Sequence, residues 1–349
     1  MINSELKKIE FNFKYSIKKY NKNYKSNHWN FQIERKKKLF KIKKLKNFRN
    51  NKLSFGLDDQ YYSEKEFIKN FNLLVEDCSK KFIKKNLFKK NVGNVKKFIK
   101  FEKKYFVDRH EIFFIKYLYD LEKNINLKKI KLICDIGSGY GALAAKILKL
   151  YNSKKIVLID LPESNLLSSF YLKKLFPKKK FFYSYQLKNN QFQKKHLNNY
   201  DIFILNPWDI FPFKNVDLFI NTRSMMEMDY QMIKKYFKLI HSKISNKGYF
   251  LNINRYYKDT TGYPIEYHKF PYDKKWKIIY SKRSWQQNHT HTMLTKRSKN
   301  YSDSIYLEQK KIKKIILKKI KDDPRLIRRI LPDTVYKIYK YFKRLIIAN

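Results

Sequence analysis

The sequence predicts an α/β fold built on a mostly parallel sheet, and three observations predict it. Short apolar runs alternate with helical patterns between residues 131 and 255. The first run, KLICDI at 131–136, leads into a glycine-rich turn and then into ALAAKILKLY, whose apolar residues recur at helical spacing. Two of the runs end in an acid, Asp135 and Asp160. Ligands of parallel sheets bind at the carboxyl ends of the strands, so both acids are candidates for a binding site.

The turn after the first strand holds three of the seven glycines of the chain, Gly137, Gly139 and Gly141. Glycine tolerates φ > 0 and lets a ligand approach the backbone closely. With Ala142 in the last place, the spacing also satisfies the dinucleotide-binding fingerprint. The Asp135 carboxylate would not stabilise a pyrophosphate bound at the helix N-terminus, whereas it would stabilise a cationic ligand. We therefore favour a cationic nucleoside ligand and keep a dinucleotide enzyme as the alternative.

The second strand, KKIVLIDL, ends at Asp160, nineteen positions after Gly141. An acid in this position can accept hydrogen bonds from both ribose hydroxyls of a bound adenosyl group. An ordinary strand-end aspartate that caps the next helix is the alternative.

Two registers compete for the third and fourth strands. In the favoured one, DIFILNPWDI at 201–210 is the third strand, which places Trp208 and Asp209 near the adenine, and VDLFINT at 216–222 is the fourth. In the other, DIFILNPW is the fourth strand, and its NPW resembles the NPPY loop of methyltransferases that act on amino groups. That match lacks the second proline and the tyrosine.

Asp135-x-Gly137-x-Gly139-x-Gly141 resembles the first motif of the class I S-adenosylmethionine-dependent methyltransferases. Together with DLPE at 160–163 and NTRSMMEM at 221–228, it resembles the sugar O-methyltransferase family found with bacterial surface-polysaccharide genes. The resemblance covers roughly residues 130–300. It implies a Rossmann-like class I fold, S-adenosylmethionine as the cofactor and transfer to a sugar hydroxyl. The cofactor residues that we expect are Asp135, Gly137, Ser138, Gly139, Gly141, Asp160, Leu161, Asp209 and Asn221.

A sugar hydroxyl is a poor nucleophile, so a positioned base is expected. Glu227 follows the fourth strand, but Ser224-x-x-Glu227 is also a capping box that could open the next helix. His268 and His291 are further candidates, because histidine titrates near neutral pH. His289 and His291 alternate on a predicted strand without a Cys or carboxylate cluster, so we expect no metal site.

Three regions are expected: a helical cap at 1–107, a methyltransferase domain at 108–298 and a basic helical tail at 299–349. His28 and Trp29 of the cap could contact the substrate, although packing is the favoured role. The final segment, LPDTVYKIYKYFKRLIIAN at 331–349, could lie on an anionic membrane surface or pack against the cap or a partner subunit.

The formal net charge is +50, from 80 Lys and Arg against 30 Asp and Glu, and 69 of the basic residues are lysine. The abundant residue types all have AT-rich codons, so codon bias accounts for most of the excess. The two cysteines and the absence of an apolar leader indicate a cytoplasmic protein, with the inner membrane surface as an option. The expected partner is a sugar, nucleotide-sugar or glycan acceptor, without specific nucleic acid. An RNA or DNA methyltransferase and a non-catalytic binding module are the alternatives.

Overall fold

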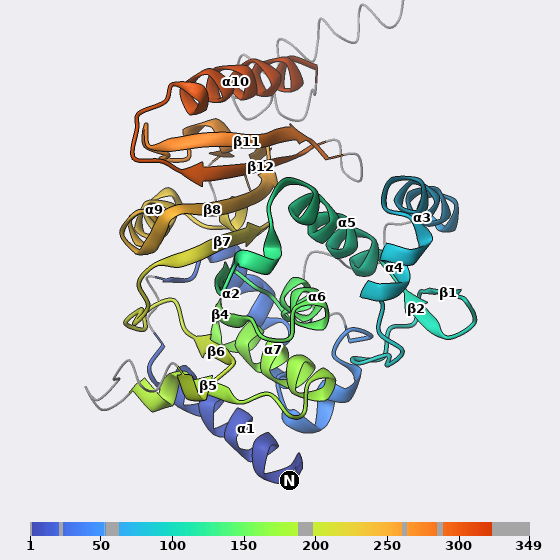
Figure 1. Ribbon diagram of the computed structural model, residues 1–349. Helices are drawn as coiled ribbons and strands as arrows, with labels where there is room; N and C mark the ends of the chain where they lie inside the picture. Colours follow the sequence, from blue (N-terminus) through green and yellow to red (C-terminus); the bar gives the residue numbers. More distant parts are fainter. Residues whose placement is uncertain are drawn as a thin grey trace, which may run out of the picture.

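An eight-stranded sheet forms the centre of the protein in the computed structural model, which describes residues 2–20, 24–51, 53, 63–187, 198–259, 264–284 and 289–322. The order is β11-β12-β8-β7-β3-β4-β6-β5 (Figure 1). The pairs from β5 to β8 are parallel, and β12 is antiparallel to both of its neighbours. The strands are β3 (Leu132–Ile136), β4 (Lys155–Ile159), β5 (Phe181–Tyr183), β6 (Ile202–Leu205), β7 (Val216–Thr222), β8 (Ile244–Arg255), β11 (Trp276–Arg283) and β12 (Thr290–Arg297).

The pairing confirms the favoured register. DIFIL (β6) pairs with β4 and VDLFINT (β7) pairs with β3, so they take the third and fourth positions by their neighbours in the sheet, although the short parallel strand β5 precedes β6 in the chain. Strand β5 extends the edge beyond β6. In the centre, Asp135 lies opposite Leu158, which brings the carboxyl end of β3 beside that of β4. The two acids that end these strands therefore share one edge of the sheet.

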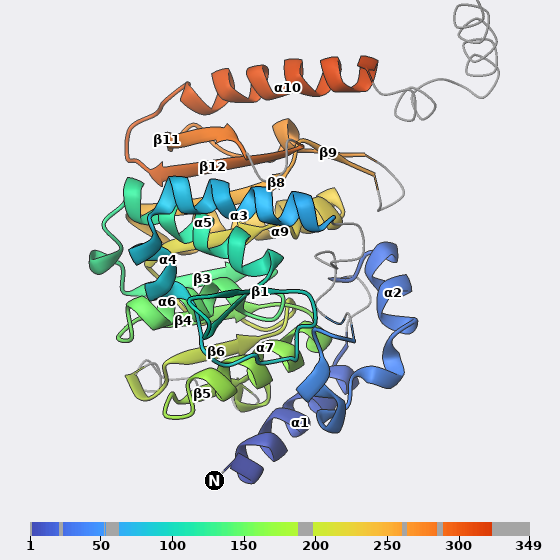
Figure 2. The same cartoon turned by 90° about the vertical axis from the view of Figure 1, so that its right-hand side faces the viewer.

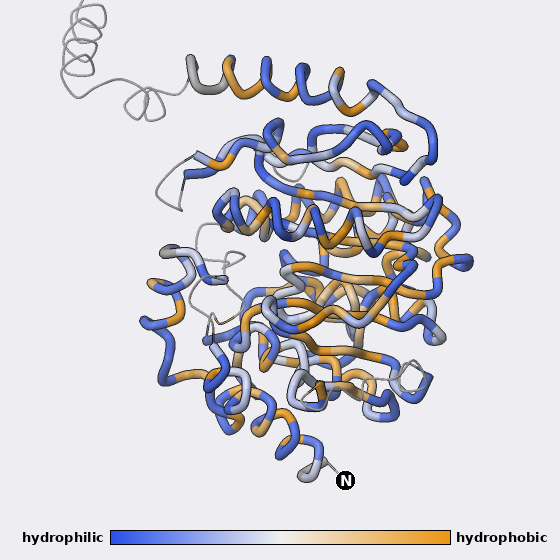
Figure 3. Tube along the Cα trace, turned by 90° about the vertical axis from the view of Figure 1, so that its left-hand side faces the viewer, coloured by the Kyte–Doolittle hydropathy of each residue, from blue (hydrophilic) through white to orange (hydrophobic). Residues whose placement is uncertain are grey.

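Helices cover both faces of the sheet and bury an apolar core on each. One core joins the sheet to α5 (Arg109–Asn124), α6 (Ala142–Leu150) and α7 (Pro162–Leu175), and the other joins it to α9 (Tyr230–Lys243) and α10 (Ser304–Asp322). The hydropathy trace shows apolar residues concentrated in the strands between these layers (Figure 3). Burial of these side chains is the main term that holds the layers together.

The N-terminal part packs on the outside of the first helical layer. Helix α1 (Ile2–Lys18) contacts α7, α3 (Glu64–Cys78) contacts α5, and α4 (Lys80–Asn86) contacts α6. Helix α2 (Asn27–Glu34) stands to one side of the sheet (Figure 2). The helices were expected, whereas the hairpin of β1 (Ile99–Phe101) and β2 (Tyr105–Val107) was not. The smaller elements are β9 (Tyr257–Lys258), β10 (Ile265–Glu266) and the 3-10 turns η2 (Lys37–Leu39), η3 (Ile42–Asn47), η5 (Leu127–Lys129), η6 (Ser184–Leu187), η7 (Met225–Glu227) and η8 (Tyr267–Lys269).

Helix α10 is the described part of the predicted basic tail, and it is joined to the core. Its Ile305, Ile312 and Ile316 are buried, and the Gln309 side chain donates to the Phe270 carbonyl at 2.8 Å. The segment at 331–349, and with it the predicted membrane contact, lies outside the described residues. Of the helices that the structure describes, none has the length and apolar character to cross a bilayer. The three-region division stays a prediction.

Candidate active site

The turn between β3 and α6 adopts the left-handed backbone that its glycines permit. Gly137, Gly139 and Gly141 have φ of 69°, 57° and 80°. A Cβ added at Gly137 would lie 1.9 Å from Ser224 Oγ, whereas one added at Gly139 would meet nothing within 4 Å. Glycine is therefore needed at Gly137 to let the β7–α9 loop approach. At Gly139 it leaves open space next to the backbone.

Asp160 links this turn to the end of β4. Its Oδ2 accepts a hydrogen bond from the Gly139 N–H at 2.7 Å, and its Oδ1 accepts one from the Leu161 N–H at 2.7 Å. Burial raises the pKa of Asp160 to about 7, although these hydrogen bonds oppose the shift. Helix α7 starts at Pro162 after Leu161, without a side-chain cap, so Asp160 is not an ordinary helix cap.

Asp135 lies beneath the glycine turn and is 2% exposed. Among the described residues its Oδ1 has no hydrogen-bond partner, and burial, with Asp160 adding to it, raises the pKa of Asp135 to about 8. Asp135 does not line the cavity described below, which Gly137, Ser138 and Gly139 above it do. A buried carboxylate without a partner is costly, and a nearby cation offsets that cost. This arrangement fits a positively charged nucleoside ligand such as S-adenosylmethionine.

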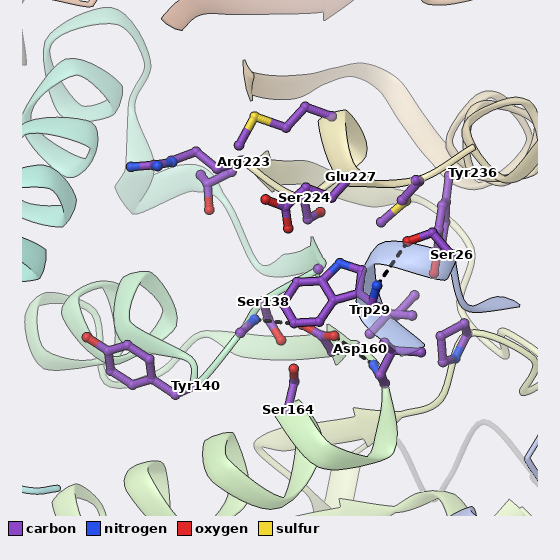
Figure 4. A pocket seen from close by; sticks show the side chains of 18 of the residues that line it. Ser26, Trp29, Ser138, Tyr140, Asp160, Ser164, Arg223, Ser224, Glu227 and Tyr236 are labelled. Carbon is purple, nitrogen blue, oxygen red and sulfur yellow. Dashed lines mark hydrogen bonds between the residues drawn. The ribbon is translucent and has the colours of Figure 1, made fainter. Parts of the chain in front are cut away.

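A cavity opens over these residues at the carboxyl edge of the sheet (Figure 4). The indole of Trp29, from α2, stands at the centre of the view, with Asp160, Ser138 and Ser164 on one side and Ser224 and Glu227 on the other. Trp29 also packs against the core, so it combines the packing role that was favoured with a place in the cavity wall. Residues of α5, of α9 and of the loops complete the wall, among them Tyr24, Ser26, Phe113, Tyr117, Tyr140, Arg223, Met228 and Tyr236.

Glu227 lies in η7 and faces the cavity, where its carboxylate forms an ion pair with Lys258 Nζ. Both side chains are nearly buried. The alternative that Ser224 and Glu227 form a capping box is wrong. Helix α9 begins at Tyr230, and its N-cap is Asp229, whose side chain accepts from the Met232 N–H at 3.1 Å. Ser224 instead accepts from Asn221 and donates to the Ile136 carbonyl.

Two expected cofactor residues serve as supports behind the wall. The Asn221 side-chain amide donates to the Ile136 carbonyl at 2.7 Å and accepts from the Met225 N–H at 3.2 Å, which holds the β7 loop under the glycine turn. Asp209 accepts from the Asn206 N–H at 2.7 Å and so closes the NPW turn. Neither side chain lines the cavity. Leu161 and Ser138 do line it, as expected.

The two candidate histidines lie elsewhere in the described structure. His291 is buried in β12, bonded to Ser281 Oγ at 2.8 Å and Tyr256 OH at 3.1 Å, and burial lowers its pKa to about 4. His268, in η8, lies 3.5 Å from the Glu266 carboxylate. Neither lines the cavity, so Glu227 is the one of the three predicted bases that the structure brings to it.

Comparison with known families identifies an O-methyltransferase domain model that matches residues 83–206. The matched region includes the glycine turn and Asp160 but ends before β7, and so before Glu227. Among curated proteins no match was found.

Similar solved structures are methyltransferases with low sequence identity. The mitomycin 7-O-methyltransferase MmcR is 11% identical, with 54% of this chain and 57% of that chain covered and a TM-score of 0.36. Human N-acetylserotonin methyltransferase in complex with SAM is 16% identical, with 55% and 57% covered and a TM-score of 0.33. An Aquifex aeolicus SAM-dependent methyltransferase is 13% identical, with 51% and 88% covered and a TM-score of 0.33. The chain spans little more than half the length of the first two proteins. The large, mostly parallel sheet flanked by helices is an α/β fold.

Proposed function

We propose that this chain transfers a methyl group from S-adenosylmethionine to a hydroxyl of a sugar or surface-glycan intermediate. The observation that carries the proposal is the Asp160 carboxylate, fixed at the strand edge by two backbone N–H groups and facing a cavity beside an open glycine backbone. The match of residues 83–206 to an O-methyltransferase domain supports the reaction class. The sugar acceptor rests on the resemblance of DLPE and NTRSMMEM alone.

The cofactor residues divide into those that contact the ligand and those that shape the loop. Asp160 would bind the ribose, and the backbone of Ser138 and Gly139 would pass under the methionine part. The buried carboxylate of Asp135 would compensate the positive charge of the sulfonium. S-adenosylmethionine supplies an activated methyl group on its sulfonium, so what the protein adds is alignment, exclusion of water and a place for the acceptor proton.

Glu227 is the proposed base. It comes from the loop after β7, faces the cavity and is held by Lys258. An anchored carboxylate at this place can accept the hydroxyl proton as the new bond to the methyl group forms. General bases contribute about 10²–10⁴-fold to rate.

The test is methyl transfer from labelled S-adenosylmethionine to nucleotide sugars and purified surface glycan, with RNA as a comparison acceptor. We expect label in the sugar fraction. Glu227→Gln should lower turnover about 10²-fold or more and leave the affinity for S-adenosylhomocysteine within about twofold. Unchanged turnover in this variant would exclude Glu227 as the base, and the absence of cofactor binding in the wild type would exclude the enzymatic function.

A further inference from the structure

Two arginines lie where β7 and β8 end, one of them in the cavity wall. Thr222, the last residue of β7, lies opposite Ile253, so Arg223 follows β7 one position short of the level of Arg255, the last residue of β8. Arg223 lines the cavity, and its guanidinium lies 5.6 Å from the centre of the Phe113 ring. Arg109 lies 5.3 Å from the same ring. Figure 4 shows Arg223 on the Glu227 side of the cavity, away from Asp160.

The backbone of Arg223 adopts a conformation that is unfavourable for its residue type. Its φ is 63°, in the left-handed region, and its N–H donates to the Ile253 carbonyl at 2.6 Å. A non-glycine residue with positive φ costs free energy and persists where its surroundings enforce it, often at functional sites. Here the strained backbone directs a guanidinium group into the wall of the cavity.

Positive charge exceeds negative charge around these residues. Among the described residues, Arg223 Nη1 and Arg255 Nε are buried without a hydrogen-bond partner, and no carboxylate forms an ion pair with either arginine. The nearest carboxylate, Glu227, is paired with Lys258. Burial lowers the pKa of Arg223, and Arg255 and Arg109 lower it further, whereas Tyr117 and Glu227 act in the opposite direction. Both side chains are partly buried, and cations that are partly removed from water are favoured by a nearby anion.

The carboxylates on the neighbouring helix cannot supply that compensation, because they already have partners. Asp108 forms an ion pair with Arg49, and Glu111 forms one with Lys146. Of the three arginines, Arg223 is the one that lines the cavity, so its charge is the one that a bound ligand would meet there.

We propose that Arg223, with Arg255 next to it, forms a subsite for an anionic group on the methyl acceptor, either a carboxylate or a phosphate. Guanidinium groups bind both in a planar, two-point geometry. The subsite lies on the Glu227 side, so it would hold an acidic sugar or a sugar phosphate with a hydroxyl near the proposed base. This inference rests on the proposed function, since it identifies the acceptor of the same reaction.

The test measures direct binding to the full chain saturated with S-adenosylhomocysteine, by calorimetry. The probes are glucuronic acid for the carboxylate, glucose 1-phosphate for the phosphate, and glucose as the uncharged match. We expect at least one charged probe to bind about 10-fold or more tighter than glucose, and its affinity to fall with added salt. The stronger of the two charged probes then distinguishes a carboxylate from a phosphate.

Arg223→Gln and Arg255→Gln should each reduce that preference about 10-fold or more, and Arg223→Lys should retain part of it because the charge remains. Arg35→Gln, at the exposed C-cap of α2, removes the same charge and should leave the preference intact. The Arg255 variant keeps the test informative if changes at the strained Arg223 prevent folding.

Several results would overturn the proposal. Charged and neutral probes could bind equally, or the Arg223 and Arg255 variants could lose affinity for S-adenosylhomocysteine alone, which would assign these arginines to the cofactor. Tight binding of RNA that both variants abolish would assign them to nucleic acid. If the wild type binds no S-adenosylhomocysteine, the proposed function is wrong. Measuring glucose 1-phosphate binding in the absence of S-adenosylhomocysteine then shows whether the anion subsite exists on its own.

Discussion

Gly137 and Gly139 allow a matched test of how the turn is built, because the same substitution meets different surroundings at the two positions. In both, alanine must adopt φ near +60°, at 69° and 57°. At Gly137 the new Cβ would lie 1.9 Å from Ser224 Oγ and 2.3 Å from Ser224 Cβ. At Gly139 it would meet no atom within 4 Å. The pair therefore separates backbone strain from a steric clash.

The expected magnitudes follow from these two terms. A left-handed backbone costs a non-glycine residue about 1–2 kcal/mol. Forcing an extra methyl group into a packed site costs about 1–3 kcal/mol more. Gly139→Ala should lower the free energy of unfolding by about 1–2 kcal/mol, and Gly137→Ala by about 2–5 kcal/mol. Although Gly139→Ala is the less destabilising change, it should lower the affinity for S-adenosylhomocysteine about 10-fold or more, because its methyl group occupies space that the ligand needs.

Urea unfolding followed by circular dichroism measures the first quantity, and calorimetry of S-adenosylhomocysteine binding measures the second. A double-mutant cycle with Ser224→Gly isolates the clash, because removing that side chain should recover about 1–3 kcal/mol of the Gly137→Ala loss. Equal destabilisation by the two alanine variants, or zero coupling between Gly137 and Ser224, would refute this account of the turn.

Three further outcomes are expected. S-adenosylmethionine affinity should rise with pH between 6 and 8, because the raised pKa values of Asp135 and Asp160 keep both carboxyl groups partly protonated until a cation binds. The rise should reach up to about tenfold per pH unit for each proton released. Calorimetry in buffers of different ionisation enthalpy counts the protons, and an affinity that does not change with pH would contradict this coupling. Without ligand, the same raised pKa values contribute to the free energy of unfolding, fully below about pH 4, and this contribution is lost as the pH rises through 7 to 8. In urea unfolding, Asp135→Asn should therefore lose less stability over this pH range than the wild type. An equal pH dependence in the two proteins would contradict the raised pKa of Asp135. Asp229→Ala should lower the free energy of unfolding by about 1 kcal/mol through loss of the α9 N-cap, whereas Ser224→Ala would show the larger capping effect if the helix began at Met225; urea unfolding of the two variants measures the difference.

The geometry of the glycine turn could be predicted from the sequence because local rules determine it. A strand that ends in an acid, followed by clustered glycines and a helical pattern, specifies a turn with positive φ whatever the rest of the chain does. The second acid then follows from the parallel pairing of β3 and β4, which places Asp160 against Gly139. The choice of register for β6 and β7 also succeeded, since it depended on the order of apolar runs.

The opposite side of the cavity could not be predicted in the same way, because it depends on contacts between segments that are distant in the sequence. Trp29 reaches the cavity from α2, and Arg223 and Arg255 meet because β7 and β8 are neighbours. The capping-box interpretation of Ser224 and Glu227 failed because the tertiary contact of Ser224 with Ile136 competes with the local cap, and Asp229 takes that role. Arg223 lay within a segment already singled out, but only the fold shows that its charge is unmatched.

Under the proposed function, the two sides of the cavity have separate tasks, cofactor binding and acceptor selection. The O-methyltransferase domain match ends at residue 206, so it contains the turn and Asp160 but neither Glu227 nor Arg223. The cavity places these two groups across from Asp160, with Trp29 between the two sides. Changes at the arginines can therefore alter the charge of the accepted substrate while the hydrogen bonds of Asp160 to Gly139 and Leu161 stay intact. Cofactor affinity and acceptor preference should accordingly vary independently among variants of this site, and coupled losses at Arg255 would contradict the separation.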